Sequence, residues 1–305
     1  MPSKYDLITI LGPTASGKTQ LAAHVALKLN GEIISGDSRQ VYRGMNLGTG
    51  KDYQDYTIDG AKIPYHLIDI VEAGSKYNVY EFQKDFFRVY NDIKERGNQP
   101  ILCGGSGLYI ESVIKGYKLI AVPDNPELRE EMRSKSDEEL IKRLSSYKNL
   151  HNQTDTTNRK RLERAIEIEE YYSKNGVDET PLPKINNIIF GVRYSRNNER
   201  KRISCRLKQR LNDGMVDEVK ALLDSGIKAE DLIYYGLEYK YLTQYIIGQI
   251  SWDEMFNQLN TAIAQFAKRQ MTWFRRMERN GADIKWIQGS IPIAEKVNIV
   301  LEMVK

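Results

Sequence analysis

The sequence has few residues of the kinds that build covalent or metal-linked frameworks. Its 305 residues include two cysteines, Cys103 and Cys205, and three histidines. Two cysteines cannot form a disulfide framework or a four-cysteine zinc site. The chain also lacks an apolar run near the ~20 residues that a membrane helix needs, and the apolar residues 7–11 are too few for a secretory signal. We therefore expect a globular protein of the reducing cytoplasm, with no membrane segment.

A strong excess of one charge is also missing. The chain holds 45 basic and 41 acidic residues, a net charge of +4. The excess lies in residues 191–305, with 19 basic and 14 acidic residues, and is densest over residues 193–210 and 268–279. This distribution suits an anionic ligand such as a nucleic acid, although a solvated helix face would have the same composition.

The first hundred residues alternate between strand and helix patterns. Apolar residues 5–11 predict a strand that ends at a Gly-Pro pair, and Leu21, Val25 and Leu29 then recur at helical spacing. Further strands are predicted at 33–34, 66–70 and 100–103, with a helix over 80–96 before the last of them. This alternation predicts an α/β fold with a parallel sheet.

The pattern changes after Pro123. Residues 125–146 and 158–174 are charge-rich helical patterns with no strand between them, and a strand returns at 188–193. Three helical stretches and a late strand at 284–287 follow. At about 150 residues per domain the length fits two domains. We predict an α/β core of residues 1–117 and 187–305 with a helical insertion at 118–186, and consecutive domains are the alternative.

A phosphate-binding loop lies between the first strand and the first helix. The residues are Gly12, Pro13, Thr14, Ala15, Ser16, Gly17, Lys18 and Thr19, which match the pattern G-x-x-x-x-G-K-[ST]. The glycines let backbone N–H groups surround phosphate oxygens, Lys18 adds a positive charge, and the Thr19 hydroxyl can bind Mg²⁺. The motif predicts a phosphorylated ligand.

Other polar residues follow the ends of neighbouring strands. Asp37 comes after the second predicted strand, and Gly104-Gly-Ser106 comes after the fourth. Each alone could belong to an ordinary tight turn. Because ligands of open α/β sheets bind at the carboxyl ends of the strands, we expect these residues to lie beside the phosphate loop.

Taken in order, the motifs resemble those of the bacterial tRNA dimethylallyltransferase family. They are Gly-Pro-Thr-Ala-Ser-Gly-Lys18-Thr, Ser-Gly-Asp37-Ser-Arg-Gln-Val-Tyr, Gly48-Thr-Gly-Lys, Pro64-Tyr-His-Leu-Ile-Asp, Gly104-Gly-Ser-Gly-Leu-Tyr, Arg161-Leu-Glu-Arg-Ala and Gln265-Phe-Ala-Lys-Arg-Gln-Met-Thr-Trp-Phe-Arg. The resemblance implies transfer of a dimethylallyl group from dimethylallyl diphosphate to N6 of the adenosine 3′ of the tRNA anticodon. It also implies a P-loop NTPase-like parallel sheet with helices on both faces, a helical insertion that grips the anticodon stem, dependence on Mg²⁺, and a monomer.

The resemblance also assigns roles by position. It implies that Asp37 is the general base, that Ser106 lies beside the reacting centre, and that Arg206 contacts the diphosphate. The implied tRNA contacts are Asp37, Ser38, Arg39, Gln40, Ser106, Arg129, Lys160, Arg161, Leu162, Glu163 and Arg164. Asp52 and Leu237 depart from the family pattern, and we expect them to affect nucleic-acid contacts rather than the chemistry.

Two other functions remain open from the residues alone. A P-loop kinase acting on a nucleoside or another small metabolite would explain the first hundred residues, with the arginine-rich helices acting as its lid. A non-catalytic nucleic-acid binder switched by ATP would suit the basic last third, but it would leave Asp37 without a task.

Overall fold

The protein is described by a computed structural model, which covers residues 3–147, 158–176 and 182–305. The chain divides into two compact units. The first joins residues 1–117 to 184–305, and the second is 118–183. The predicted boundaries lay at 118 and 186.

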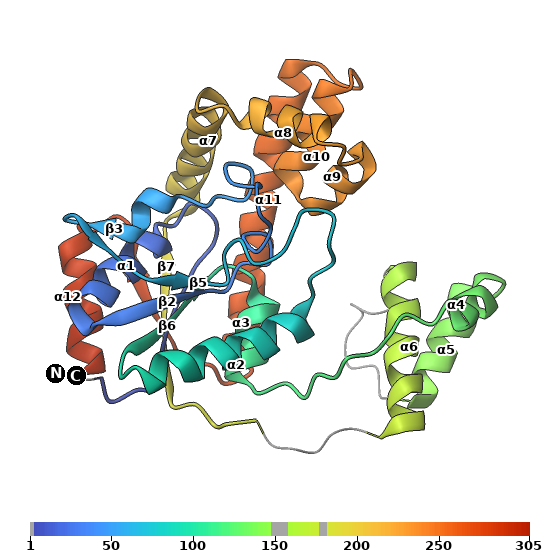
Figure 1. Ribbon diagram of the computed structural model, residues 1–305, viewed down its shortest axis with the longest axis horizontal. Helices are drawn as coiled ribbons and strands as arrows, with labels where there is room; N and C mark the ends of the chain where they lie inside the picture. Colours follow the sequence, from blue (N-terminus) through green and yellow to red (C-terminus); the bar gives the residue numbers. More distant parts are fainter. Residues whose placement is uncertain (1–2, 148–157, 177–181) are drawn as a thin grey trace. The chain divides into compact units, whose positions relative to one another are not determined.

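A six-stranded parallel sheet forms the centre of the first unit (Figure 1). Its strands are β1 (Leu7–Leu11), β2 (Gly31–Ser35), β5 (Tyr65–His66), β6 (Gln99–Gly104), β7 (Asn187–Arg193) and β8 (Ile284–Gln288). They lie in the order β5-β2-β6-β1-β7-β8. The register pairs Ile8 with Ile101 of β6 and with Ile188 of β7, so β1 is central and buried on both faces.

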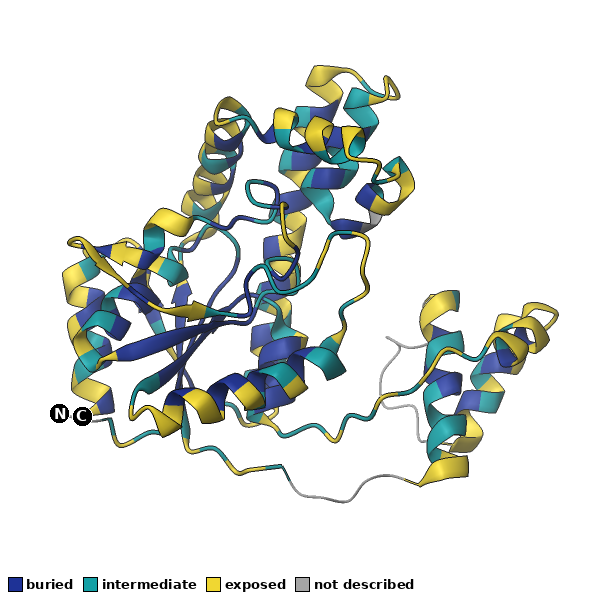
Figure 2. Cartoon of the chain, in the orientation of Figure 1, coloured by how far each residue is buried: buried dark blue, intermediate teal, exposed yellow. Residues whose placement is uncertain are grey.

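Helices cover both faces of this sheet. Helices α1 (Lys18–Leu29) and α12 (Ile293–Val304) pack with Ile8 and Ile10 on one face. Helices α2 (Val79–Glu95), α3 (Gly107–Ile114) and part of α11 (Trp252–Arg279) pack with Leu7 and Leu11 on the other. Figure 2 shows the buried residues concentrated in the strands and on the inner sides of these helices. The predicted α/β, P-loop-like fold is confirmed.

One predicted strand is much shorter than expected. The apolar run 66–70 forms a strand only at β5, because Leu67 and Asp69 adopt the left-handed conformation with φ of 60° and 55°. That conformation breaks an extended ladder. A 3₁₀ turn, η1 (Tyr53–Tyr56), and a small hairpin of β3 (Thr57–Ile58) and β4 (Ala61–Lys62) precede β5.

Five helices, rather than the three expected stretches, separate β7 from β8. They are α7 (Arg196–Asn212), α8 (Met215–Asp224), α9 (Ala229–Tyr235), α10 (Leu237–Ile246) and α11. Glycines with positive φ at 214, 226 and 248 interrupt the helical pattern, because glycine adopts this backbone conformation at little cost. The helices share a core with Val41, Tyr42 and Met45.

The second unit is a small helical unit with its own hydrophobic core. It contains α4 (Pro126–Arg133), α5 (Asp137–Tyr147) and α6 (Arg159–Asn175), packed around Met132, Leu144, Leu162 and Ile166. The helical pattern predicted over 125–146 forms two helices, α4 and α5. The helical conformation is interrupted at residues 134–136, where Ser136 caps α5 by accepting a hydrogen bond from Glu139 N–H (3.2 Å).

Candidate active site

A large cavity lies at the carboxyl ends of the central strands in the first unit. Its volume is about 840 Å³. Its lining includes Thr14–Gln20 of the phosphate loop and α1, Asp37–Gln40 after β2, Ser106 after β6, and Arg206 of α7. The structure therefore brings most of the predicted residues of the α/β core together from four separate segments of the chain, whereas Gly12 and Pro13 are not among the lining residues.

The phosphate loop has the backbone conformation that anion binding requires. Ala15 and Gly17 adopt positive φ of 59° and 78°, and α1 begins at the next residue, Lys18. A β-carbon on Gly12 would lie 2.7 Å from the Val192 carbonyl oxygen, so this position admits only glycine. Successive N–H groups in such a loop, together with a helix N-terminus, form a concave site for phosphate.

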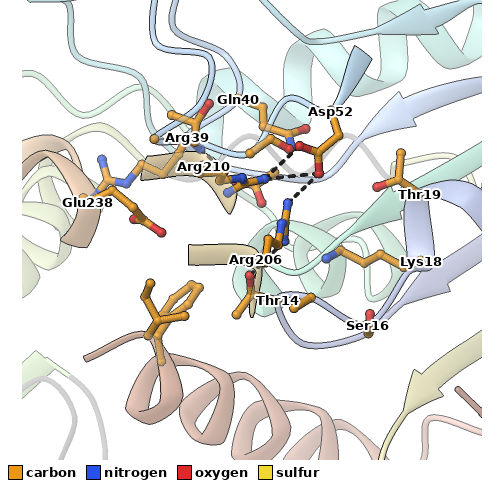
Figure 3. A pocket seen from close by; sticks show the side chains of 18 of the residues that line it. Thr14, Ser16, Lys18, Thr19, Arg39, Gln40, Asp52, Arg206, Arg210 and Glu238 are labelled. Atoms are coloured by element: carbon orange, nitrogen blue, oxygen red, sulfur yellow. Dashed lines mark hydrogen bonds and ion pairs between the residues drawn. The ribbon is translucent and has the colours of Figure 1, made fainter. Parts of the chain in front are cut away.

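Lys18 and two hydroxyl groups complete the loop (Figure 3). The Lys18 ammonium lies 3.4 Å from the Pro13 carbonyl oxygen. Burial lowers the pKa of Lys18, and the negative charge of Asp37 opposes that change. Among the residues described, Ser16 Oγ is buried and has no hydrogen-bond partner. Thr19 hydrogen-bonds Cys103, whose thiol pKa is raised by burial to about 12.

The turn after β2 is tied to the loop after β6. Asp37 Oδ1 accepts a hydrogen bond from the Arg39 N–H (2.9 Å), which holds the turn in shape. Ser106 Oγ accepts a hydrogen bond from the Ser38 N–H (3.0 Å) and lies 3.3 Å from Ser38 Oγ. These bonds fix Asp37 and Ser106 on the same edge of the sheet, as predicted.

Three arginines at four-residue spacing on α7 reach this edge (Figure 3 labels two of them). Arg202 Nε donates to the Ala15 carbonyl oxygen (2.8 Å), and Arg206 Nη1 lies 3.4 Å from Thr14 Oγ1. Arg206 and Arg210 also form ion pairs with Asp52, at 2.8 and 3.0 Å. Asp52 therefore contacts directly the arginine that is expected to bind diphosphate, and its expected effect on nucleic-acid contacts stays a prediction.

Two side chains that position the site were not predicted from the sequence. Gln270 of α11 accepts a hydrogen bond from the Thr14 N–H (2.9 Å) and donates one to the Gly105 carbonyl oxygen (2.9 Å). Glu218 of α8 accepts hydrogen bonds from the N–H groups of residues 46–48, at 2.7–3.1 Å. Gln270 lies within a motif already noted, but no local signal marks Glu218.

The residues of the insertion predicted to contact tRNA have mixed environments. Arg129 and Arg164 both pair with the buried carboxylate of Glu167, at 2.6 and 2.9 Å. Lys160 and Arg161 are exposed. Glu163 pairs with Arg159 (2.7 Å). Leu162 is fully buried in the core of the insertion, so its side chain cannot contact tRNA as predicted.

Comparison with known proteins gives consistent matches over nearly the whole chain. The family model described as IPP transferase matches residues 40–277. A protein of Bacteroides fragilis named tRNA dimethylallyltransferase 2 is 62% identical over 301 residues, covering 99% of this chain and 98% of that protein. A protein of the same name from Phocaeicola vulgatus is 60% identical over 98% of each chain.

Solved structures agree with the sequence matches. A tRNA isopentenylpyrophosphate transferase of Bacillus halodurans is 32% identical, with a TM-score of 0.72, covering 99% of this chain and 96% of that one. A eukaryotic dimethylallyltransferase acting on tRNA shares the fold, with a TM-score of 0.75 at 22% identity, over 93% of this chain and 73% of its own.

In the described part of the chain, no helix is both long and apolar enough to span a bilayer.

Proposed function

The chain belongs to the IPP transferase family, and we propose that it transfers a dimethylallyl group from dimethylallyl diphosphate to tRNA, at N6 of the adenosine 3′ of the anticodon. The observation that carries this proposal is the convergence of three chemical elements on one cavity. These are a phosphate loop, a carboxylate at the end of β2, and an arginine of α7. Family membership argues against the kinase and the ATP-switched binder.

The phosphate loop and α7 would hold the diphosphate. Residues 15–19, including Lys18, and Arg206 line the cavity, where their backbone N–H groups and positive charges would bind phosphate oxygens. As the allylic C–O bond breaks, its electron pair goes to the diphosphate, which gains negative charge. Positive groups fixed in advance stabilise that charge without reorganising during the reaction.

Asp37 would act on the nucleophile. The exocyclic amine of adenine is a weak nucleophile, so a carboxylate that takes up its proton as the C–N bond forms lowers the barrier. The turn bonds to Arg39 and Ser106 hold Asp37 at the cavity edge. Ser106, which already accepts a hydrogen bond from Ser38, would sit beside the same reacting atoms.

The residues present fit a magnesium ion bound together with diphosphate. Among the described residues no group of three or more metal-ligating side chains occurs, but Mg²⁺ usually binds one or two protein oxygens and completes its shell with phosphate and water. The Thr19 hydroxyl lines the cavity, and the buried, unpartnered Ser16 Oγ lies in the same loop. Bound Mg²⁺ would neutralise charge on the leaving group.

The insertion and the turn after β2 would supply the tRNA contacts. The exposed side chains of Lys160 and Arg161, together with Arg129 and Arg164, offer positive charge for phosphates of the anticodon stem. Ser38, Arg39 and Gln40 line the cavity and would contact the anticodon loop. The monomeric state remains a prediction from the family resemblance, and the cytoplasmic location remains a prediction from the composition.

Transfer of label tests the proposed function. The protein, incubated with unmodified tRNA, Mg²⁺ and labelled dimethylallyl diphosphate in the absence of ATP, should move the label to tRNA. A parallel reaction with γ-labelled ATP should leave the tRNA and small acceptors unlabelled. An absolute requirement for ATP, or transfer of its phosphate, would overturn the proposal in favour of a kinase.

A further inference from the structure

The arginines of the diphosphate site already bind a carboxylate of the protein. Asp52 Oδ2 lies 2.8 Å from Arg206 Nη2, and Asp52 Oδ1 lies 3.0 Å from Arg210 Nη2 (Figure 3). Burial alone would raise the pKa of Asp52, but Arg206 and Arg210 outweigh it and hold the pKa below its usual range. The carboxylate is therefore ionised at neutral pH and is bound to two guanidinium groups that line the cavity, one of which, that of Arg206, reaches the phosphate loop.

The two arginines also have neighbours other than Asp52. Gly50 packs directly against them, since a β-carbon there would lie 2.7 Å from Arg210 Nη2 and 2.8 Å from Arg206 Nη2. Arg206 also reaches Thr14 Oγ1 of the phosphate loop (3.4 Å). The Asp52 side chain is 31% exposed, about as much as that of Arg206 (30%), and lies just before the turn η1. A rotation of this side chain toward solvent would release both guanidinium groups.

We propose that Asp52 takes the place of phosphate oxygens on Arg206 and Arg210 in the free enzyme, and must be displaced when diphosphate binds. This inference rests on the proposed function, and it makes Asp52 a residue that limits affinity for diphosphate. The effect falls most heavily on pyrophosphate, the product. Pyrophosphate has no allyl group, so its affinity comes from charge and hydrogen bonds alone, and a competing carboxylate weakens both.

If Asp52 instead supported diphosphate binding, removal of its charge would have the opposite effect on affinity. If Asp52 acted as a bracket that aligns two like-charged guanidinium groups, or as a ligand for magnesium, removing its charge would weaken diphosphate binding. If it competes with phosphate, removing its charge frees both arginines and ends a repulsion between anions a few ångströms apart, and binding becomes tighter.

Calorimetric titration with inorganic pyrophosphate in the presence of MgCl₂ separates the two roles. We expect Asp52→Asn to bind pyrophosphate about tenfold more tightly than the wild type. Asp52→Glu keeps the charge and should bind like the wild type. The matched control is Asp55→Asn, which removes a nearby carboxylate that accepts a hydrogen bond from Gln20 (3.2 Å). It should tighten binding much less than Asp52→Asn does, because Asp55 lies in the same cavity but hydrogen-bonds Gln20 rather than an arginine.

Product inhibition gives an independent measure. In label transfer, the inhibition constant of pyrophosphate should fall by the same factor in Asp52→Asn, and Asp52→Ser provides a second uncharged variant if the first unfolds. If the wild type transfers label but Asp52→Asn binds pyrophosphate no more tightly than the wild type, the inference alone is overturned. Tightening of the same size in Asp55→Asn overturns it as well. A wild-type protein that transfers no dimethylallyl label overturns the proposed function instead.

Discussion

Two carboxylates mark the two ends of strand β2, and their surroundings give them different tasks. Asp37 follows the carboxyl end and lines the cavity. Glu32 is buried near the other end, where it accepts hydrogen bonds from Arg96 (2.8 and 3.0 Å), Asn98 (2.7 Å) and His66 (2.6 Å). We propose a role in the chemistry for the first, and we expect the second to stabilise the fold.

Replacing Asp37 by asparagine should separate binding from chemistry. The variant keeps the shape of the side chain but cannot take up the N6 proton, so the rate of transfer should fall by roughly 10²- to 10⁴-fold. Donor affinity should change little, because the phosphate loop and Arg206 supply it. Single-turnover transfer with saturating tRNA and donor, beside direct donor binding, measures both quantities. A near-normal rate would contradict the assignment of the base, whereas lost donor binding would point to magnesium coordination.

Replacing Glu32 by glutamine should reduce stability in a pH-dependent way. Burial alone would raise the pKa of Glu32, but the hydrogen bonds from Arg96, Asn98 and His66 lower it from 4.5 to about 2. A carboxyl with a lowered pKa stabilises the fold fully above its unfolded pKa and loses that contribution as pH falls toward the folded value.

We expect Glu32→Gln to lower the free energy of unfolding by about 2 kcal/mol at pH 7, somewhat less than the full shift would give because Arg96 is half exposed. Urea unfolding of both proteins should show this difference shrinking between pH 4.5 and 2. A difference that stays constant over that range would show that packing, not charge, is responsible.

At the scale of elements, Gln270 connects helix α11 to two loops of the active site. Its amide bonds the Thr14 N–H and the Gly105 carbonyl, so one buried side chain sets the spacing between the phosphate loop and the loop that carries Ser106. Leucine at this position would leave both backbone groups without partners, which costs about 1–3 kcal/mol for each buried group.

Gln270→Leu should therefore lower both thermal stability and turnover, and raise the KM for dimethylallyl diphosphate. Gln265→Leu, at an exposed position on the same helix, is the control and should leave thermal stability, turnover and KM unchanged. Steady-state kinetics beside thermal unfolding make the comparison. Normal kinetics in a destabilised Gln270→Leu protein would show that the amide holds the fold together without aligning the site.

The elements that could be predicted are those with a local cause. The phosphate loop follows from its glycines, and α2 follows from the Asn78 and Glu81 capping box and its apolar face. The strand expected at 66–70 failed because the left-handed turn at Leu67 and Asp69 leaves no mark in an apolar pattern. The pairing of Arg206 with Asp52 joins residues 154 positions apart, so only the tertiary fold reveals it.

At the scale of the whole molecule, the insertion carries positive charges of two kinds. Arg129 and Arg164 pair with the buried Glu167, whereas Lys160 and Arg161 are exposed. Alanine at either exposed position should weaken tRNA binding and reduce the log–log salt slope by ~0.7–0.9 for each lost phosphate contact, without loss of stability. Alanine at 129 or 164 should also destabilise the insertion, because it leaves a buried carboxylate short of a partner.

Filter binding of tRNA over a range of salt concentrations, with thermal unfolding and pyrophosphate affinity as controls, tests these expectations. Pyrophosphate affinity should be the same in all four variants. An unchanged salt slope at Lys160 and Arg161 would assign these charges to an ordinary solvated surface.

The position of β1 has a consequence for synthesis on the ribosome. This first strand pairs with β6 on one side and with β7 on the other, and the 66 residues of the insertion are translated between them. From Gly104 to Arg193 the ribosome adds 89 residues, which takes roughly 4–18 s at about 5–20 residues per second. Through that interval one edge of β1 has no partner strand, and open edges are where chains mispair. In the nascent protein, β1 can therefore pair on one side only until the insertion and β7 have been translated.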